Sequence, residues 1–165
     1  MSMAAEKREA QFVTFSLGEE VFAVPVESVR EILDHEESFQ LPHGPEYLLG
    51  LRDVRGQGVP IIDLRLKLGR TRTVKTQHTR ILVMDIPLAD RVLTVGLVAD
   101  RVFEVIPFRL EQIEGAPDIG IAWRSDYIRG VVRRETGFVV IIDLVRLFTA
   151  AETPALTNLP EMAHA

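Results

Sequence analysis

The chain has 165 residues, with 19 Lys and Arg against 24 Asp and Glu, and therefore a net charge of −5. Its 47% hydrophobic and 26% charged residues are ordinary globular proportions, which exclude a disordered or collagen-like chain and, at this length, predict one domain. No apolar run approaches the roughly 20 residues that span a bilayer, and the acidic balance argues against nucleic acid as a partner. Without cysteine there is no disulfide or thiolate site, and without a secretory signal at the start we expect a cytoplasmic protein that does not insert into the membrane.

The first elements have the alternation of β-strands. Residues 12–17 and 21–24 lie on either side of Gly18-Glu19-Glu20 and predict a β-hairpin. The spacing of the apolar residues in 26–33, after Pro25, predicts one short amphipathic helix.

A second hairpin is predicted from strands over 48–55 and 59–62. The turn between them is Gly56-Gln57-Gly58, because glycine supplies the positive φ that tight turns need. Asp63 then lies where a helix N-cap is expected, and Gly69 is a stop signal five residues after the helix begins.

After a polar connector over 70–78, the second half of the chain has a similar series of predicted strands followed by a short helix. Its strands are predicted over 80–84, 92–99, 102–106, 127–133 and 138–142. Asp143 is expected to cap a second short helix over 144–148. We expect residues 1–10 and 150–165 to be flexible tails around a domain over 11–149.

An internal repeat supports two similar halves, about 11–78 and 79–149. At an offset of 80, seven residues recur: Tyr47, Gly50, Val59, Ile61, Ile62, Asp63 and Leu64 return as Tyr127, Gly130, Val139, Ile141, Ile142, Asp143 and Leu144. At an offset of 73, Val29, Glu31 and Ile32 meet Val102, Glu104 and Val105. The repeat predicts two small β units, each too thin to bury both faces, that share a core where they meet.

No catalytic or metal-binding signature is present, so we expect neither an enzyme nor a cofactor. Gly56-Gln57-Gly58 lacks the third glycine and the helix of a dinucleotide site. Residues 34–37, Asp-His-Glu-Glu, are typical of a solvated loop rather than a cation site. Asp63 and Asp143 both follow Ile-Ile and open a short helix, which favours capping over a carboxylate pair.

Charged residues leave one candidate contact site. Two basic groups, Arg70, Arg72 and Lys75, and Arg129, Arg133 and Arg134, have no interleaved aromatic residues and are interpreted as solvated charge. Arg55, at a glycine-rich hairpin tip beside an apolar run, suits a protein contact, and an ordinary surface arginine is the alternative. Asp53, two residues earlier, is expected to face the same side and orient the Arg55 guanidinium.

Eight segments occur in the order of a known family: Phe12–Gly18, Val29–Ile32, Gly50–Gly56, Val59–Arg65, Val95–Asp100, Val102–Val105, Tyr127–Gly130 and Ile141–Leu144. Together they resemble the CheW family of chemotaxis coupling proteins, over nearly the whole chain. The family commonly has Asn-Leu-Arg-Gly where this chain has Asp53-Val54-Arg55-Gly56.

The resemblance implies an all-β fold of two SH3-like five-stranded β-barrels that share a hydrophobic core. It also implies a non-catalytic adaptor that bridges the cytoplasmic tip of chemoreceptors to the regulatory domain of a CheA-type histidine kinase, recruited to membrane-associated receptor arrays. The receptor-contact positions of the family fall on Val29, Glu31 and Arg55, with Gly56 supporting the tip. Gly50 matches a glycine whose loss disturbs coupling, and with Asp53 it is expected to support the contact.

A different class of function stays open at this point. A groove between the two barrels is a possible site for a small regulatory molecule. The sequence does not show the convergent polar and aromatic residues that such sites usually have.

Overall fold

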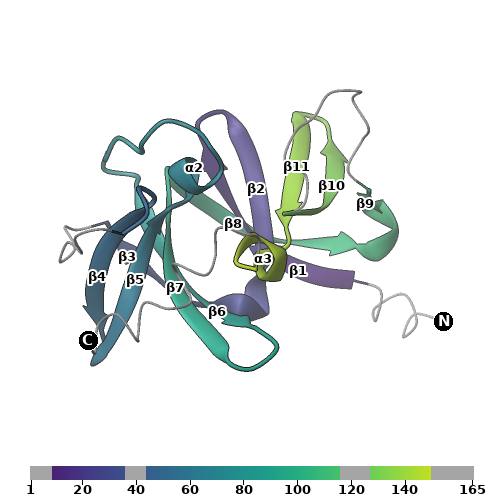
Figure 1. Ribbon diagram of the computed structural model, residues 1–165. Helices are drawn as coiled ribbons and strands as arrows, with labels where there is room; N and C mark the ends of the chain where they lie inside the picture. Colours follow the sequence, from purple (N-terminus) through teal and green to yellow (C-terminus); the bar gives the residue numbers. More distant parts are fainter. Residues whose placement is uncertain (1–8, 36–43, 116–126, 150–165) are drawn as a thin grey trace.

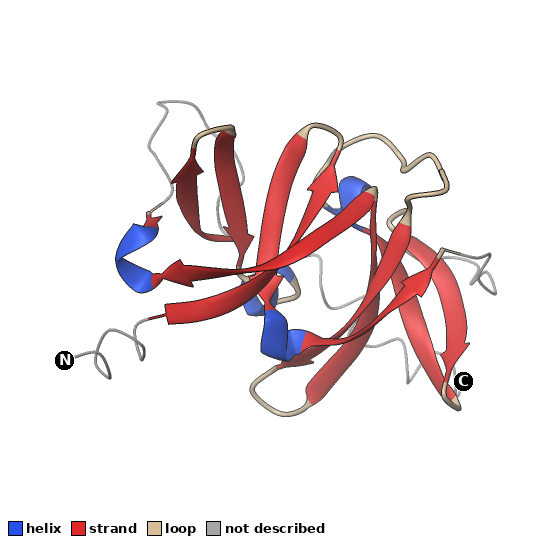
Figure 2. Ribbon diagram, turned by 180° about the vertical axis from the view of Figure 1, so that it is seen from behind, coloured by secondary structure: helices blue, strands red, loops and turns tan. Residues whose placement is uncertain are grey.

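The computed structural model describes residues 9–35, 44–115 and 127–149, and these ranges form strands joined by short turns and very short helices (Figures 1 and 2). The strands are β1 (Glu9–Leu17), β2 (Glu20–Pro25), β3 (Val29–Asp34), β4 (Leu48–Val54), β5 (Gln57–Asp63), β6 (Arg80–Pro87), β7 (Val92–Ala99), β8 (Arg101–Arg109), β9 (Ile113–Glu114), β10 (Ile128–Arg134) and β11 (Gly137–Ile142). The helices are η1 (Val26–Ser28), α2 (Leu64–Lys67), η2 (Leu110–Gln112) and α3 (Leu144–Leu147). The predicted tails lie outside the described residues, except for Glu9 and Ala10, which are the first residues of β1 and not part of a tail.

The strands form two sheets, and each sheet combines both halves of the chain. Sheet A has the order β8-β1-β2-β11-β10-β9, and sheet B has the order β3-β6-β7-β5-β4. The first hairpin of each half thus lies in the sheet of the other half, joined there by the parallel pairs β2–β11 and β5–β7. Figure 1 shows sheet B on the left and sheet A on the right, with α3 between them. The mainly β fold is confirmed, and the two halves of the sequence repeat are interleaved in space.

The repeat is visible in the local hydrogen bonding. The register of β4 against β5 shifts between Leu48 and Gly50, and that of β10 against β11 shifts between Ile128 and Gly130. The amide of Asp63 donates to the Tyr47 carbonyl at 2.8 Å, and the amide of Asp143 donates to the Tyr127 carbonyl at 2.6 Å. Identical residues at an offset of 80 therefore make the same register shift and the same hydrogen bond in both sheets.

Both predicted aspartate caps are confirmed. A carboxylate oxygen of Asp63 accepts from the amides of Arg65 and Leu66 at the start of α2, and Asp143 accepts from the amide of Arg146 in α3. Such a cap satisfies amides that have no partner within the helix. Gly69, with φ of 83°, follows the end of α2 as expected.

The predicted helix over 26–33 is wrong. Only Val26–Ser28 is helical, as one 3-10 turn, and Val29–Asp34 is strand β3, antiparallel to β6. Val29, Ile32 and Leu33 pair with Met84, Leu82 and Ile81. A register shift after Val29 breaks the alternation of the strand, so the apolar spacing imitates that of a helix.

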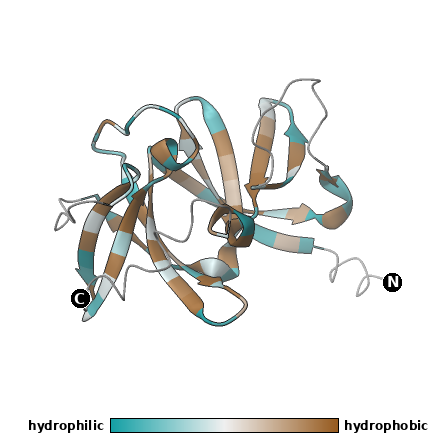
Figure 3. Cartoon of the chain, in the orientation of Figure 1, coloured by the Kyte–Doolittle hydropathy of each residue, from teal (hydrophilic) through white to brown (hydrophobic). Residues whose placement is uncertain are grey.

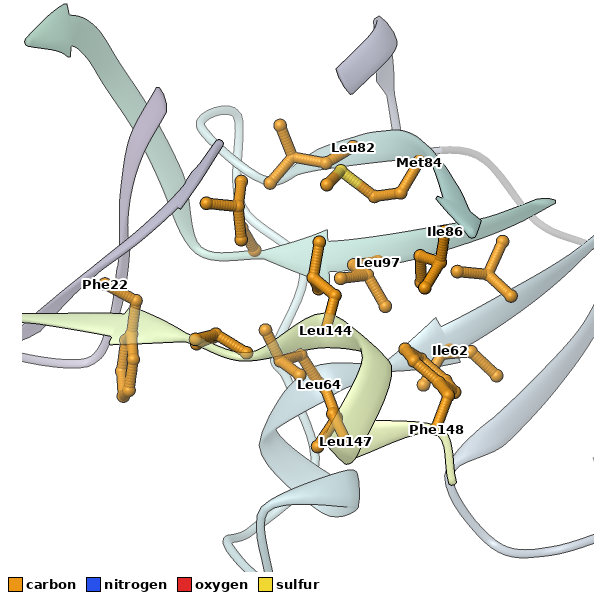
Figure 4. Close-up of a cluster of buried hydrophobic side chains, with 14 of the residues drawn as sticks. Phe22, Ile62, Leu64, Leu82, Met84, Ile86, Leu97, Leu144, Leu147 and Phe148 are labelled. Carbon is orange, nitrogen blue, oxygen red and sulfur yellow. The ribbon is translucent and has the colours of Figure 1, made fainter. Parts of the chain in front are cut away.

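Buried side chains form a core between the sheets and a smaller core within each sheet. The central cluster includes Phe15 and Phe22 of sheet A. Figure 4 shows Phe22 with other members of the cluster, among them Leu82 and Leu97 of sheet B and Phe148 after α3. The core within sheet A is Phe12, Ala23, Phe108, Val132, Val139 and Ile141, and the core within sheet B is Val54, Val59, Ile61, Ile81, Val83 and Val98. Hydrophobic residues accordingly occupy long stretches of the strands (Figure 3). The expected shared core is confirmed.

Substitution of either repeated glycine by valine is expected to lower the free energy of unfolding by about 1–3 kcal/mol, for two different reasons. Gly50 has φ of 155°, which side chains rarely adopt. A Cβ at Gly130 would lie 2.7 Å from the Glu114 carbonyl oxygen and 2.6 Å from Ile113 Cγ2. Gly58→Ala is the control, because no atom lies within 4 Å of its added Cβ. Urea denaturation measures the three variants; midpoints for Gly50→Val and Gly130→Val equal to that of Gly58→Ala would contradict this account.

Candidate functional site

The tip between β4 and β5 is a two-residue turn made of Arg55 and Gly56. Val54 pairs directly with Gln57, so Gln57 and Gly58 belong to β5 and the predicted turn over 56–58 is wrong in its position. Both turn residues have positive φ, 52° at Arg55 and 83° at Gly56, as a type I′ turn requires. This turn suits the twist of a hairpin, and glycine adopts it without strain, whereas arginine does not.

Strand β3 lies against this turn. The Arg55 Nε donates to Glu31 Oε2 at 3.0 Å, and the two form an ion pair. The Glu31 side chain is 19% exposed and the Arg55 side chain is 81% exposed. Glu31 therefore holds one nitrogen of the guanidinium while most of the group faces solvent.

Two other expected site residues, Val29 and Gly50, lie on strands β3 and β4 and outside the turn. Val29, on the same strand as Glu31, is half-buried and packs against the central core. Gly50 lies at the register shift of β4, where it sets the path of the strand that leads to the turn. The structure thus brings Glu31, Arg55 and Gly56 together, and Val29 and Gly50 are on the strands that carry them.

The expected orienting role of Asp53 is wrong. Asp53 lies in β4 opposite Gly58, and no hydrogen bond or ion pair joins it to Arg55 within the described residues. The reason is the positive φ of Arg55, which ends the strand and breaks the alternation from which a shared face was inferred. The carboxylate that orients the guanidinium is that of Glu31.

Sequence reasoning missed Arg30 and Gln57. Arg30 Nη1 donates to Gln57 Oε1 at 3.0 Å, so a second residue of β3 contacts the strand that leaves the turn. Arg30 Nε also lies 3.5 Å from Asp85 Oδ2. The only signal in the sequence was that Arg30 is next to Glu31. A regular strand would place the Arg30 side chain on the face opposite to that of Glu31, away from the turn.

One residue of each basic group forms an ion pair among the described residues. Arg70 forms an ion pair with Glu20, and its guanidinium lies 5.6 Å from the ring centroid of Phe22. Arg133 lies 3.6 Å from Glu114 and stacks at 5.6 Å on Phe138, its partner across the β10–β11 hairpin. The sequence could not show these aromatic neighbours, because they lie across strands.

No group of three or more potential metal ligands is present in the parts of the chain that the structure describes. A pocket of about 350 Å³ lies at one end of sheet A, lined among others by Glu19, Arg134 and Phe138. Its lining residues belong to β2, β11, the end of β10 and the turns beside them, so this pocket is within sheet A and not between the sheets. No helix among the described residues is long and apolar enough to cross a membrane.

His35, next to the end of β3, has an unusual electrostatic environment. Burial is the main cause that lowers the pKa of its imidazole below the ordinary 6.5; Lys75 and Arg52 act in the same direction and Asp63 opposes them. Its Nδ1 is buried and has no hydrogen-bond partner among the residues that the structure describes. The folded protein therefore favours the neutral imidazole.

A fall in pH from about 7.5 to 5.5 is expected to reduce the free energy of unfolding through His35. The unfolded chain takes up a proton near pH 6.5 and the folded chain only at lower pH, so this stability is intact above 6.5 and is lost as the pH falls below it. Urea denaturation over this range should give a smaller pH dependence for His35→Gln than for the wild type. Identical dependence in the two proteins would show that His35 is not responsible.

Comparisons with known proteins agree with the fold. The sequence profile of the CheW-like domain matches residues 11–152. The chain is 29% identical over 157 residues to "Chemotaxis protein CheW" of Treponema pallidum, covering 95% of this chain and 92% of that protein. It is 31% identical over 147 residues to "Probable chemotaxis protein CheW" of Rhizobium etli, covering 89% and 92%.

A solved structure is also similar. The scaffolding protein TtCheW from Thermoanaerobacter tengcongensis superimposes with a TM-score of 0.75 at 27% identity, over 87% of this chain and 90% of that one. The profile, the relatives and the fold all cover most of the chain. This chain therefore belongs to the CheW-like domain family.

Proposed function

We propose that the protein is a non-catalytic adaptor that couples chemoreceptors to a CheA-type histidine kinase in the cytoplasm. Membership of a family whose relatives are named as chemotaxis proteins, with a solved member described as a scaffolding protein, supports this function. The observation that carries the proposal to particular residues is the conformation of Arg55. Val29, Glu31, Arg55 and Gly56 are the proposed receptor contacts.

Arg55 is the only residue other than glycine with a positive φ in the described ranges. A left-handed conformation costs an ordinary residue about 1–2 kcal/mol, and glycine would avoid this cost. Strain of this kind persists where the side chain has a role that another residue would not fill. At Arg55 the side chain is an exposed guanidinium at the end of a rigid hairpin.

The chemistry of the turn suits a partner that offers a carboxylate or carbonyl oxygen. Glu31 fixes the Nε edge of the guanidinium, which leaves the exposed Nη groups as a planar pair of donors. Prior orientation by Glu31 reduces the entropy that Arg55 loses when it binds. An arginine held in this way has the properties of an interface hot spot.

The alternative, a small-molecule module, has less support. The pocket of about 350 Å³ lies at the end of sheet A, away from the proposed groove between sheets. The family match also favours an adaptor. The proposed kinase contact is a barrel-end surface of the first half, separate from the turn.

Pairwise and ternary binding tests the proposal. Isothermal titration should show binding to a chemoreceptor tip fragment and, separately, to the kinase regulatory domain. Size-exclusion chromatography of the three together should then give one complex that contains all of them. Competition between receptor fragment and kinase domain for the protein would contradict an adaptor.

A further inference from the structure

Two consecutive residues of β3 contact the two residues that flank Gly56. Glu31 accepts from Arg55 Nε at 3.0 Å, and Arg30 Nη1 donates to Gln57 Oε1 at 3.0 Å. We call these two contacts the β3 clasp. Together they fix the turn from its first residue and from the strand that follows it.

A regular strand does not allow such a clasp, because consecutive side chains point to opposite faces. The register between β3 and β6 shifts between Val29 and Glu31, which pair with Met84 and Val83, and leaves Arg30 without a partner residue on β6. This is a β-bulge, a feature that redirects side chains and is frequent beside functional sites. The bulge explains how Arg30 and Glu31 both reach the same turn.

Arg30 is itself held from the other side. Its Nε lies 3.5 Å from Asp85 Oδ2, and Asp85 Oδ1 accepts from Thr94 Oγ1 at 2.7 Å across the β6–β7 hairpin. The Arg30 and Asp85 side chains are 43% and 37% exposed, so the ion pair by itself adds little stability. Its effect is to restrict the directions that the Arg30 side chain adopts.

The other half of the repeat serves as an internal comparison. The residues 73 positions after Arg30 and Glu31 are Phe103 and Glu104, and the residue 80 positions after Arg55 is Glu135. These side chains offer no opposite charges, yet β10 and β11 are joined by a two-residue turn of the same length, with Arg134 paired to Gly137. The fold therefore closes this hairpin without a clasp.

We propose that Arg30 is a positioning residue, which acts through Gln57 and is supported by Asp85 to hold the Arg55-Gly56 turn in the conformation that binds the partner. This role rests on the proposed function, since the turn is the proposed receptor contact. It differs from a direct contact, in which Arg30 would bind the receptor independently of Gln57.

A double-mutant cycle on receptor-fragment binding tests the role. Arg30→Ala and Gln57→Ala should each raise the Kd by about fivefold, and the double variant should raise it no further, because both remove the same contact. Gln57→Glu, unlike Gln57→Ala, keeps an oxygen acceptor for Arg30 and should therefore bind the receptor fragment with wild-type affinity. Phe103→Ala, at the equivalent position in the other half, is the matched control and should bind as the wild type does.

The outcomes separate the inference from the proposed function. Wild-type affinity in Arg30→Ala, or a double variant whose loss is the product of the single losses, would overturn the positioning role while the receptor contact stands. A wild-type protein that does not bind the fragment would overturn both. Thermal melting of each variant is recorded, and a melting temperature unchanged in Arg30→Ala is expected because the equivalent hairpin folds without the clasp.

Discussion

Replacement of Arg55 by glycine is expected to weaken binding to a chemoreceptor tip fragment by about 2 kcal/mol or more, the loss typical of an interface hot spot. The same change should leave the free energy of unfolding equal to or above that of the wild type. Glycine adopts φ of 52° without strain, and the exposed ion pair with Glu31 contributes about 1 kcal/mol at most. Isothermal titration and urea denaturation on the same preparations measure the two effects.

The control for Arg55→Gly is Glu135→Gly, at the equivalent turn of the β10–β11 hairpin. Arg55→Glu is a second test, because it reverses the charge of an exposed side chain with an expected stability change of about 0.5 kcal/mol or less. Kinase-domain binding should change less than receptor binding in each Arg55 variant. Full receptor affinity in a folded Arg55→Glu protein would mean that Arg55 is ordinary surface and that the proposed contact is wrong.

Asp63→Ala is expected to lower the free energy of unfolding by about 3 kcal/mol, through loss of a cap and of buried hydrogen bonds. Asp63 is 1% exposed. It accepts from the amides of Arg65 and Leu66 and from both the amide and the hydroxyl of Thr73, at 2.9 Å and 2.8 Å. Removal of the carboxylate leaves these donors without a partner and releases the connector from α2.

Asp143→Ala is the matched comparison and should cost about 1 kcal/mol, the usual value for a helix cap. Asp143 is 31% exposed, and its contacts among the described residues are with Arg146, whose amide donates to it at 3.0 Å and whose Nε lies 3.8 Å away. Urea denaturation of the two variants should therefore give different midpoints. Equal losses would show that the bonds to Thr73 add nothing to the cap.

The sequence predicted the features that depend on neighbouring residues. The hairpins, the caps Asp63 and Asp143 and the stop at Gly69 follow from local rules, and the structure confirms them. The repeat also predicted the shared core. Ile61 packs in the core within sheet B and Ile141 in the core within sheet A, while Ile62 and Ile142 both pack in the central cluster between the sheets. Alternation along the strand is enough to assign these faces.

The features that failed depend on residues far apart in the chain. The local pattern predicts a helix in place of strand β3 because the partner strand β6 begins 51 residues after Val29, at Arg80. The exchange of the first hairpins between the two sheets cannot be inferred from the sequence repeat. The same repeat would be found if each half of the chain formed its own sheet. The sequence assigns the orienting role to Asp53 because it predicts the turn over 56–58, one residue later than the observed turn at Arg55-Gly56, and so treats Arg55 as part of a regular strand.

The measurement that most directly tests the central proposal is the autophosphorylation rate of a CheA-type kinase, titrated with the pure protein in the presence and absence of chemoreceptor. An adaptor should change the rate only when receptor and kinase are both present, with saturation near one molecule per kinase subunit. Arg55→Gly should require a higher concentration, and Glu135→Gly should match the wild type. A rate that is independent of the protein, or an effect at strongly substoichiometric amounts, would contradict the account.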